Sequence, residues 1–154
     1  MDSSSEYQLL GDELLDLVRE RLAQGQRVRY LPFRGVSMLP MLRQKLDTVE
    51  LSPLPQRLKK YDLPVYQYPS GKVVMHRVVK VRKQDYVCLG DNTYSYEYIT
   101  HSQMIGVVSA FKRGNRRIEV DSPLYQCYCR VWVLCYPVRK GWRRCKALVR
   151  RVLK

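Results

Sequence analysis

Short apolar or alternating runs, separated by turn residues, constrain the fold of this 154-residue chain more than any other feature. Such runs follow one another from residue 26 to 121, with Pro, Gly, Asn and Asp between them. Side chains that alternate in and out are typical of strands with one buried face, and Arg113, Gly114 and Asn115 indicate a hairpin turn. The runs are RVRYLPF, DTVEL, PVYQY, KVVMHRVVKV, DYVCLG, MIGVVSAFK and RRIEV. The sequence therefore predicts a mostly β, α+β fold with a largely antiparallel sheet.

A helix is predicted ahead of this β body. Residues 6 to 24 carry leucines near helical spacing, with acids early and arginines late, which suits the helix dipole. Gly25 follows and is a typical helix end. Together with the β body of residues 26 to 121, this helix makes up the predicted domain of residues 1 to 122.

The last segment, residues 123 to 154, has a different composition. It holds nine Lys and Arg and no acid, whereas all 14 acids of the chain precede it. Pro123 is a permitted first helical residue, and residues 124 to 136 are almost entirely apolar. After Pro137, apolar residues recur at helical spacing among basic ones. The sequence predicts a basic amphipathic helical tail.

Several classes of protein are disfavoured by what the sequence lacks. The N-terminus has no basic start and apolar run of a secretory signal, and no run of about 18 apolar residues forms a conventional membrane span. We therefore expect a cytoplasmic protein. Four of the five cysteines crowd into the tail, but a C-x-C followed by spacings of six and ten is unlike zinc modules. Free thiols, no metal site and no cofactor are expected.

Three polar residues stand in unusual contexts. Ser37 lies in FRGVSMLP, framed by a glycine and a proline, and Asp91 lies in the turn GDN. His76 interrupts KVVMHRVVKV, and a regular strand there would put it on the same face as Val74 and Val78. Serine, histidine and aspartate are the set that makes a hydroxyl nucleophilic near neutral pH. A packed histidine and an ordinary turn are the alternative interpretation.

Four motifs in a fixed order give these residues a family context. Their order resembles that of the signal peptidase and self-cleaving repressor superfamily of serine peptidases (S24/S26), over about residues 26 to 120. The motifs are GVSMLP (35 to 40), HRVV (76 to 79), GDN (90 to 92) and IGVV (105 to 108). The resemblance implies the antiparallel β fold of that superfamily and a serine endopeptidase. Such an enzyme would prefer small residues near the cut and need no cofactor.

The resemblance also implies a role for each site residue. His76 stands where most members have a lysine base, so the chain resembles the histidine type found in the endoplasmic reticulum and in archaea. Ser37 is then the nucleophile, His76 the general base and Asp91 the orienting acid. Gly35 replaces a serine that many signal peptidases use on the oxyanion, so the backbone N–H of Ser37 is expected to serve there. Asp47 matches a recurring turn of the family and is expected to be structural.

The partners follow from these expectations. Because neither an Ala-Gly nor a Cys-Gly dipeptide occurs, we expect cleavage of a peptide or leader in trans. The tail, residues 123 to 154, has the pattern of an interfacial helix on anionic lipid, which would put the protein at the inner face of the membrane. Nucleic acid is disfavoured, since 34 residues before GVSMLP leave little room for a DNA-binding domain. The alternative function is a non-catalytic module that docks on a membrane or a partner through the tail.

Overall fold

The computed structural model describes residues 3 to 30 and 35 to 152, and the surroundings of side chains over residues 13 to 29, 35 to 143 and 145. Within this part the protein is α+β, with antiparallel sheets and three α-helices. The helices are α1 (Ser3–Ala23), α2 (Pro123–Leu134) and α3 (Tyr136–Val152), with a short 3-10 helix at His101–Gln103. The strands are β1 (Val28–Tyr30), β2 (Thr48–Ser52), β3 (Pro64–Gln67), β4 (Val73–Met75), β5 (Arg77–Val81), β6 (Tyr86–Leu89), β7 (Glu97–Ile99), β8 (Met104–Arg113) and β9 (Arg116–Glu119).

Two antiparallel sheets form the β body. The larger has the order β1-β2-β8-β3-β4, and β9 pairs with the end of β8. The smaller has the order β5-β6-β7. The hairpin predicted around Gly114 is confirmed, since β8 and β9 pair directly across it. Strand β7 was not predicted from the sequence.

The chain changes sheets at His76. Met75 pairs with Val65 in the larger sheet, whereas Arg77 pairs with Leu89 in the smaller one. The prediction of one continuous strand through KVVMHRVVKV is therefore wrong, because each half of this run pairs with a different sheet. His76 belongs to neither strand and lies at the junction.

Helix α1 packs on the larger sheet through one side. Leu15, Val18 and Leu22 are buried in the main core cluster. The approach is close, because a Cβ atom at Gly106 of β8 would lie 2.8 Å from Cδ1 of Leu22. A glycine at that position lets helix and strand meet.

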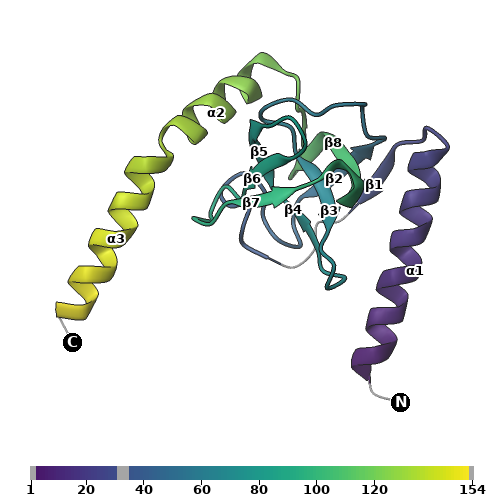
Figure 1. The fold of residues 1–154 in the computed structure, drawn as a ribbon, viewed down its shortest axis with the longest axis horizontal. Coiled ribbons are helices and arrows are strands. Elements are labelled where there is room, and N and C mark those ends of the chain that lie inside the picture. The colour runs from purple at the N-terminus through teal and green to yellow at the C-terminus, as the bar shows by residue number, and fades with distance from the viewer. Residues whose placement is uncertain (1–2, 31–34, 153–154) are drawn as a thin grey trace.

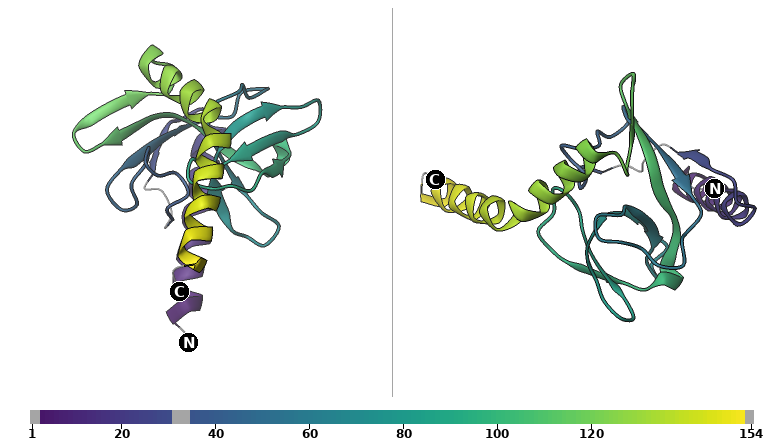
Figure 2. Two further views of the ribbon diagram at one scale, coloured as in Figure 1. Left: turned by 90° about the vertical axis from the view of Figure 1, so that its left-hand side faces the viewer. Right: turned by 90° about the horizontal axis from the view of Figure 1, so that it is seen from above.

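The core extends into the segment predicted as a tail. Tyr125 and Cys129 of α2 belong to the same core cluster as the residues of α1. Helix α3 then leaves the body. Figure 1 shows α1 and α3 on opposite sides of the body, both running toward the same end of the molecule, and the left panel of Figure 2 shows this shared direction. Within the described residues, no helix has the length and apolar character needed to cross a bilayer.

Candidate active site

The junction between the two sheets places His76 against a carboxylate. Nδ1 of His76 lies 2.7 Å from Oε2 of Glu97, the first residue of β7. The hydroxyl of Tyr66 also donates to Oε2 of Glu97 and lies 3.2 Å from Nδ1 of His76. His76 is only 5% exposed, so this contact fixes the ring. Glu97, not Asp91, is the carboxylate that orients the imidazole.

The charge of Glu97 sets the tautomer of His76. Burial raises the pKa of Glu97, but hydrogen bonds from His76 and Tyr66 together outweigh it and leave the pKa below its ordinary value. Burial, then the contact with Glu97, raises the pKa of Tyr66, which keeps that hydroxyl protonated as a donor. An ionised carboxylate only accepts hydrogen bonds, so Nδ1 of a neutral His76 must carry the proton. The lone pair is then on Nε2.

Ser37 and His76 line the same cavity, which has a volume of about 320 Å³. Glu97 also lines it, as do Tyr68 and Lys72. Ser37 is half-buried, and no direct hydrogen bond joins its Oγ to the His76 ring among the contacts of these two described residues. The apolar lining residues are Met38, Leu42, Val49, Val65, Val73, Val74 and Met75. The cavity thus combines a hydroxyl and an oriented imidazole with an apolar wall.

The GDN turn holds the Ser37 loop through the backbone. The N–H of Asn92 donates to the carbonyl of Ser37 at 2.7 Å, and the side-chain amide of Asn92 donates to the carbonyl of Val36 at 3.2 Å. The carbonyl of Val36 and the N–H of Ser37 belong to one planar peptide unit. Fixing that carbonyl therefore fixes the direction of the Ser37 N–H. The loop continues through a cis Leu39-Pro40 bond.

Gly90 allows the turn to come this close. A Cβ atom at Gly90 would lie 2.9 Å from the carbonyl oxygen of Ser37 and 2.9 Å from the side chain of Thr93. A backbone oxygen cannot move aside as the end of a flexible side chain can. The first residue of GDN must therefore be glycine for the loop to stay where it is.

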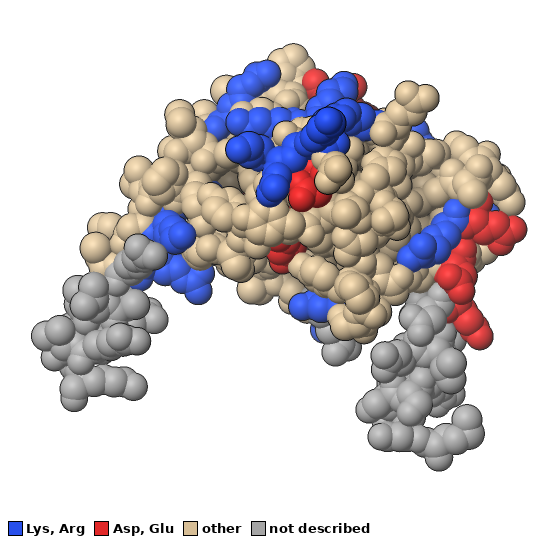
Figure 3. Space-filling model, viewed as in Figure 1, with Lys and Arg blue, Asp and Glu red and all other residues tan. Residues whose placement is uncertain are grey.

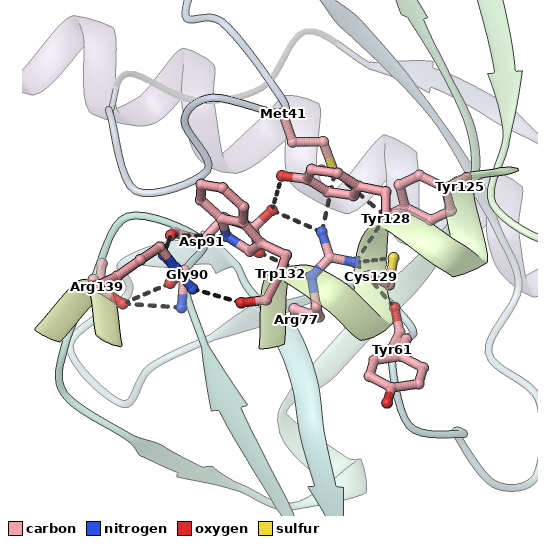
Figure 4. A network of polar contacts seen from close by, with 11 residues as sticks. Met41, Tyr61, Arg77, Gly90, Asp91, Tyr125, Tyr128, Cys129, Trp132 and Arg139 are labelled. Carbon is pink, nitrogen blue, oxygen red and sulfur yellow. Dashed lines mark hydrogen bonds and ion pairs between the residues drawn. The ribbon is translucent and has the colours of Figure 1, made fainter. Parts of the chain in front are cut away.

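Asp91 has a partner other than the one expected from the sequence. Its two carboxylate oxygens accept from Nε and Nη2 of Arg77 at 2.8 and 2.7 Å (Figure 4). Arg77 is fully buried and Asp91 is 3% exposed. Burial alone would lower the pKa of Arg77, but the hydrogen bonds and charge of Asp91 raise it. The expectation that Asp91 orients His76 is thus corrected, because the neighbouring buried guanidinium takes both oxygens.

Arg77 also reaches helix α2. Its Nη1 donates to the hydroxyl of Tyr125 at 2.9 Å and to Sγ of Cys129 at 2.8 Å (Figure 4). The carbonyl of Asp91 accepts from Nε1 of Trp132 at 3.1 Å and from Arg139 at 2.8 Å. The Arg77–Asp91 pair therefore connects the strand after His76, the GDN turn and the C-terminal helices.

Glu97 and Asn92 were missed in the sequence. Nothing in YSYEYI marks Glu97 by its local pattern. One signal was available, because Glu97 is the only acidic residue between Asp91 and Glu119. Asn92 is part of the GDN motif, but a turn motif does not predict which segment its third residue will contact.

The remaining residues named from the sequence lie outside the lining of the cavity. Asp47 is fully buried and accepts from the backbone N–H and the guanidinium of Arg43, which is a structural role. All five cysteines are unpaired, and only Cys88 and Cys129 are buried. Within the described residues, no group of three His, Cys, Asp or Glu side chains could hold a metal ion.

Comparisons of this chain with protein-family models, curated proteins and solved structures gave no match. Its function has to be inferred from its own residues.

Proposed function

We propose that this protein is a serine endopeptidase of the signal-peptidase-like type, which cleaves a peptide or leader sequence in trans. The observation that supports it is the pairing of His76 with Glu97 on the wall of a cavity that also holds Ser37. A histidine whose Nδ1 is engaged by a carboxylate presents the lone pair of Nε2, which is what a serine nucleophile needs. The four ordered motifs of the sequence resemble the same class of enzyme.

The reaction proceeds in two halves. Oγ of Ser37 attacks the scissile carbonyl while Nε2 of His76 takes the hydroxyl proton, and Glu97 stabilises the resulting imidazolium. His76 then gives this proton to the leaving amine, and an acyl group stays on Ser37. In the second half a water molecule attacks the acyl carbonyl while His76 takes a proton from it. His76 then returns this proton to Oγ of Ser37 as the acyl–oxygen bond breaks, which releases the carboxylic acid product.

The backbone N–H of Ser37 supplies the oxyanion contact. Gly35 lines the cavity and has no hydroxyl to offer. The two hydrogen bonds from Asn92 to the carbonyls of Val36 and Ser37 hold the N–H of Ser37 in one direction before substrate arrives. A donor that needs no reorganisation stabilises the developing charge most effectively.

The substrate backbone binds along β4. This strand is at the end of the larger sheet, where it pairs with β3 alone among the described strands, and all three of its residues line the cavity. An extended peptide can add to such an edge by main-chain hydrogen bonds. The apolar wall then receives the residues on the acyl side of the cut, for which the family resemblance implies small side chains.

Replacing Ser37 by Ala tests the proposal. We expect Ser37→Ala to abolish cleavage in a peptide library read by mass spectrometry, with an unchanged circular dichroism spectrum. Ser95→Ala is the matched control, because Ser95 is an exposed serine outside the cavity. Cleavage that persists in Ser37→Ala would remove this residue from the mechanism.

A second candidate function is a non-catalytic docking module at the inner face of a membrane. The observation that favours it is the exposed apolar side of α2 and α3, which active-site chemistry does not require. A wild-type protein that cleaves nothing in the library, but binds anionic vesicles, would favour this second function.

A further inference from the structure

Helix α3 begins with its basic side turned toward the β body. Tyr136 is buried and its hydroxyl donates to the carbonyl of Tyr94 at 3.0 Å. The guanidinium of Arg139 lies 4.0 Å from the ring centre of Trp132, and that of Arg143 lies 4.8 Å from the ring centre of Tyr94. The first contact joins α3 to Trp132 of α2, and the second holds the start of α3 against the segment that follows GDN.

The opposite side of the two helices is apolar and exposed. Four exposed apolar residues, at positions 131, 134, 138 and 142, follow one another at spacings of three or four, so they form one line along α2 and α3. Their exposed fractions, which show how far they project, are 54% for Val131, 78% for Leu134, 74% for Val138 and 65% for Trp142. We call these four residues the outer stripe. A surface helix normally turns its apolar side inward, so this inverted arrangement marks an interaction surface.

We propose that the outer stripe docks on an anionic membrane surface. Residues 123 to 154 carry nine Lys and Arg and no acid, so a negative surface attracts the segment that bears the stripe. Apolar side chains and a tryptophan next to basic residues are what an interfacial helix needs. A second copy of the chain, paired through the same stripe, would bring two such positive segments together. Nucleic acid would attract the charge but gain nothing from the apolar side chains.

The shape of the molecule allows this docking. Helices α2 and α3 lie in front of the β body in the left panel of Figure 2, so a flat surface can approach them from that side. Figure 3 shows acidic side chains beside α1 and basic ones where α3 leaves the body, with a further basic group over the top of the β body. Glu13, Asp16 and Glu20 of α1 are exposed. An anionic surface would repel α1 and attract α3, which gives the docked protein one orientation.

Vesicle sedimentation of the full chain tests the proposal. We expect binding to vesicles of phosphatidylcholine mixed with phosphatidylglycerol, weaker binding to phosphatidylcholine alone, and a loss of binding as salt is raised. The double variant Leu134→Asp/Val138→Asp should bind more than about tenfold more weakly. Each substitution removes an apolar side chain and so loses the free energy gained by burying it in lipid. Leu46→Asp is the matched control, since Leu46 is 67% exposed and lies outside the helices.

Three results would overturn the proposal. One is equal vesicle binding by the double variant and the wild type. Another is a wild-type dimer in light scattering that the double variant converts to monomer, which would assign the stripe to a second copy. The third is salt-sensitive DNA binding without vesicle binding. Ser37→Ala should bind vesicles like the wild type, so this surface and the peptidase function are tested separately.

Discussion

At the scale of single residues, Glu97 determines what His76 can do. The hydrogen bond from Nδ1 of His76 to Glu97 keeps the proton on Nδ1 and fixes the orientation of the ring. Glu97→Gln keeps the size of the side chain but removes the charge, and its amide can present a donor to Nδ1. We expect kcat to fall by roughly a hundredfold to ten-thousandfold, as in triads whose carboxylate is replaced by an amide. Steady-state kinetics on a cleaved peptide provide the measurement.

Asp85→Asn is the control for this prediction. Asp85 is also a partly buried acid of the smaller-sheet region, but its partner is Arg82 and it does not line the cavity. It should leave kcat unchanged. If Glu97→Gln were as active as Asp85→Asn, His76 would not depend on this carboxylate.

The single-residue predictions succeeded where the pattern of neighbours was local. Asp47 was expected to be structural, and its carboxylate accepts three hydrogen bonds from Arg43, four residues away, besides one from the backbone N–H of Gly114. The partner of Asp91 could not be predicted in the same way, because His76 and Arg77 are adjacent in sequence and either could face the turn. The change of sheets between them decides the matter, since it turns Arg77 inward to Asp91 and His76 to Glu97.

At the scale of elements, the Arg77–Asp91 pair joins strand β5, the GDN turn and helix α2. Asp91→Asn removes the charge and leaves a fully buried guanidinium without its carboxylate. Removing one partner of a buried pair is costly because the other charge stays desolvated. We expect the free energy of unfolding in urea to fall by about 3–5 kcal/mol.

The pair Arg82–Asp85 provides the comparison. The side chains of Arg82 and Asp85 are 49% and 25% exposed, against 0% and 2% for Arg77 and Asp91, so water screens the Arg82–Asp85 pair far better. Asp85→Asn should change the free energy of unfolding by no more than about 1 kcal/mol. Equal losses in the two variants would mean that Asp91 contributes no more than a surface pair.

The strands were predictable because apolar and polar residues alternate within the runs. Val49 and Leu51 are buried while Thr48 and Glu50 are half-exposed, as period-two alternation predicts. The division into two sheets was not predictable, because the residues on either side of His76 carry the same β pattern. Pairing partners depend on the register of distant strands, such as Val65 with Met75. The short strand β7 has only three residues, too few for a pattern to show.

At the scale of the whole molecule, the boundary suggested by charge and the boundary of the packed core lie at different places in the chain. The composition changes at residue 123, which suggested a separate tail. Packing continues further, because Tyr125 and Cys129 face the core and contact Arg77. Their spacing of four was a helical signal in the sequence. However, it did not predict which side of the helix would face the body, and at the start of α3 the basic residues Arg139 and Arg143 lie inward.

Two truncations separate these roles. A chain that ends at residue 122 loses Tyr125 and Cys129 from the core and exposes the Arg77–Asp91 pair. A chain that ends at residue 143 keeps α2, Arg139 and the outer stripe, and loses residues 144 to 154. We expect the shorter chain to have a far lower Tm, or no cooperative transition, in differential scanning calorimetry.

The chain that ends at residue 143 should keep both Tm and peptide cleavage near those of the full chain, because it retains the contacts of Asp91 with Arg77, Trp132 and Arg139. Its affinity for anionic vesicles should fall, since residues 144 to 154 carry five of the nine basic residues of the C-terminal segment and each contributes about 1 kcal/mol near an anionic surface. If the chain that ends at residue 122 melted like the full chain, α2 would be dispensable for the fold. The inward contacts of Tyr125 and Cys129 would then carry no stability.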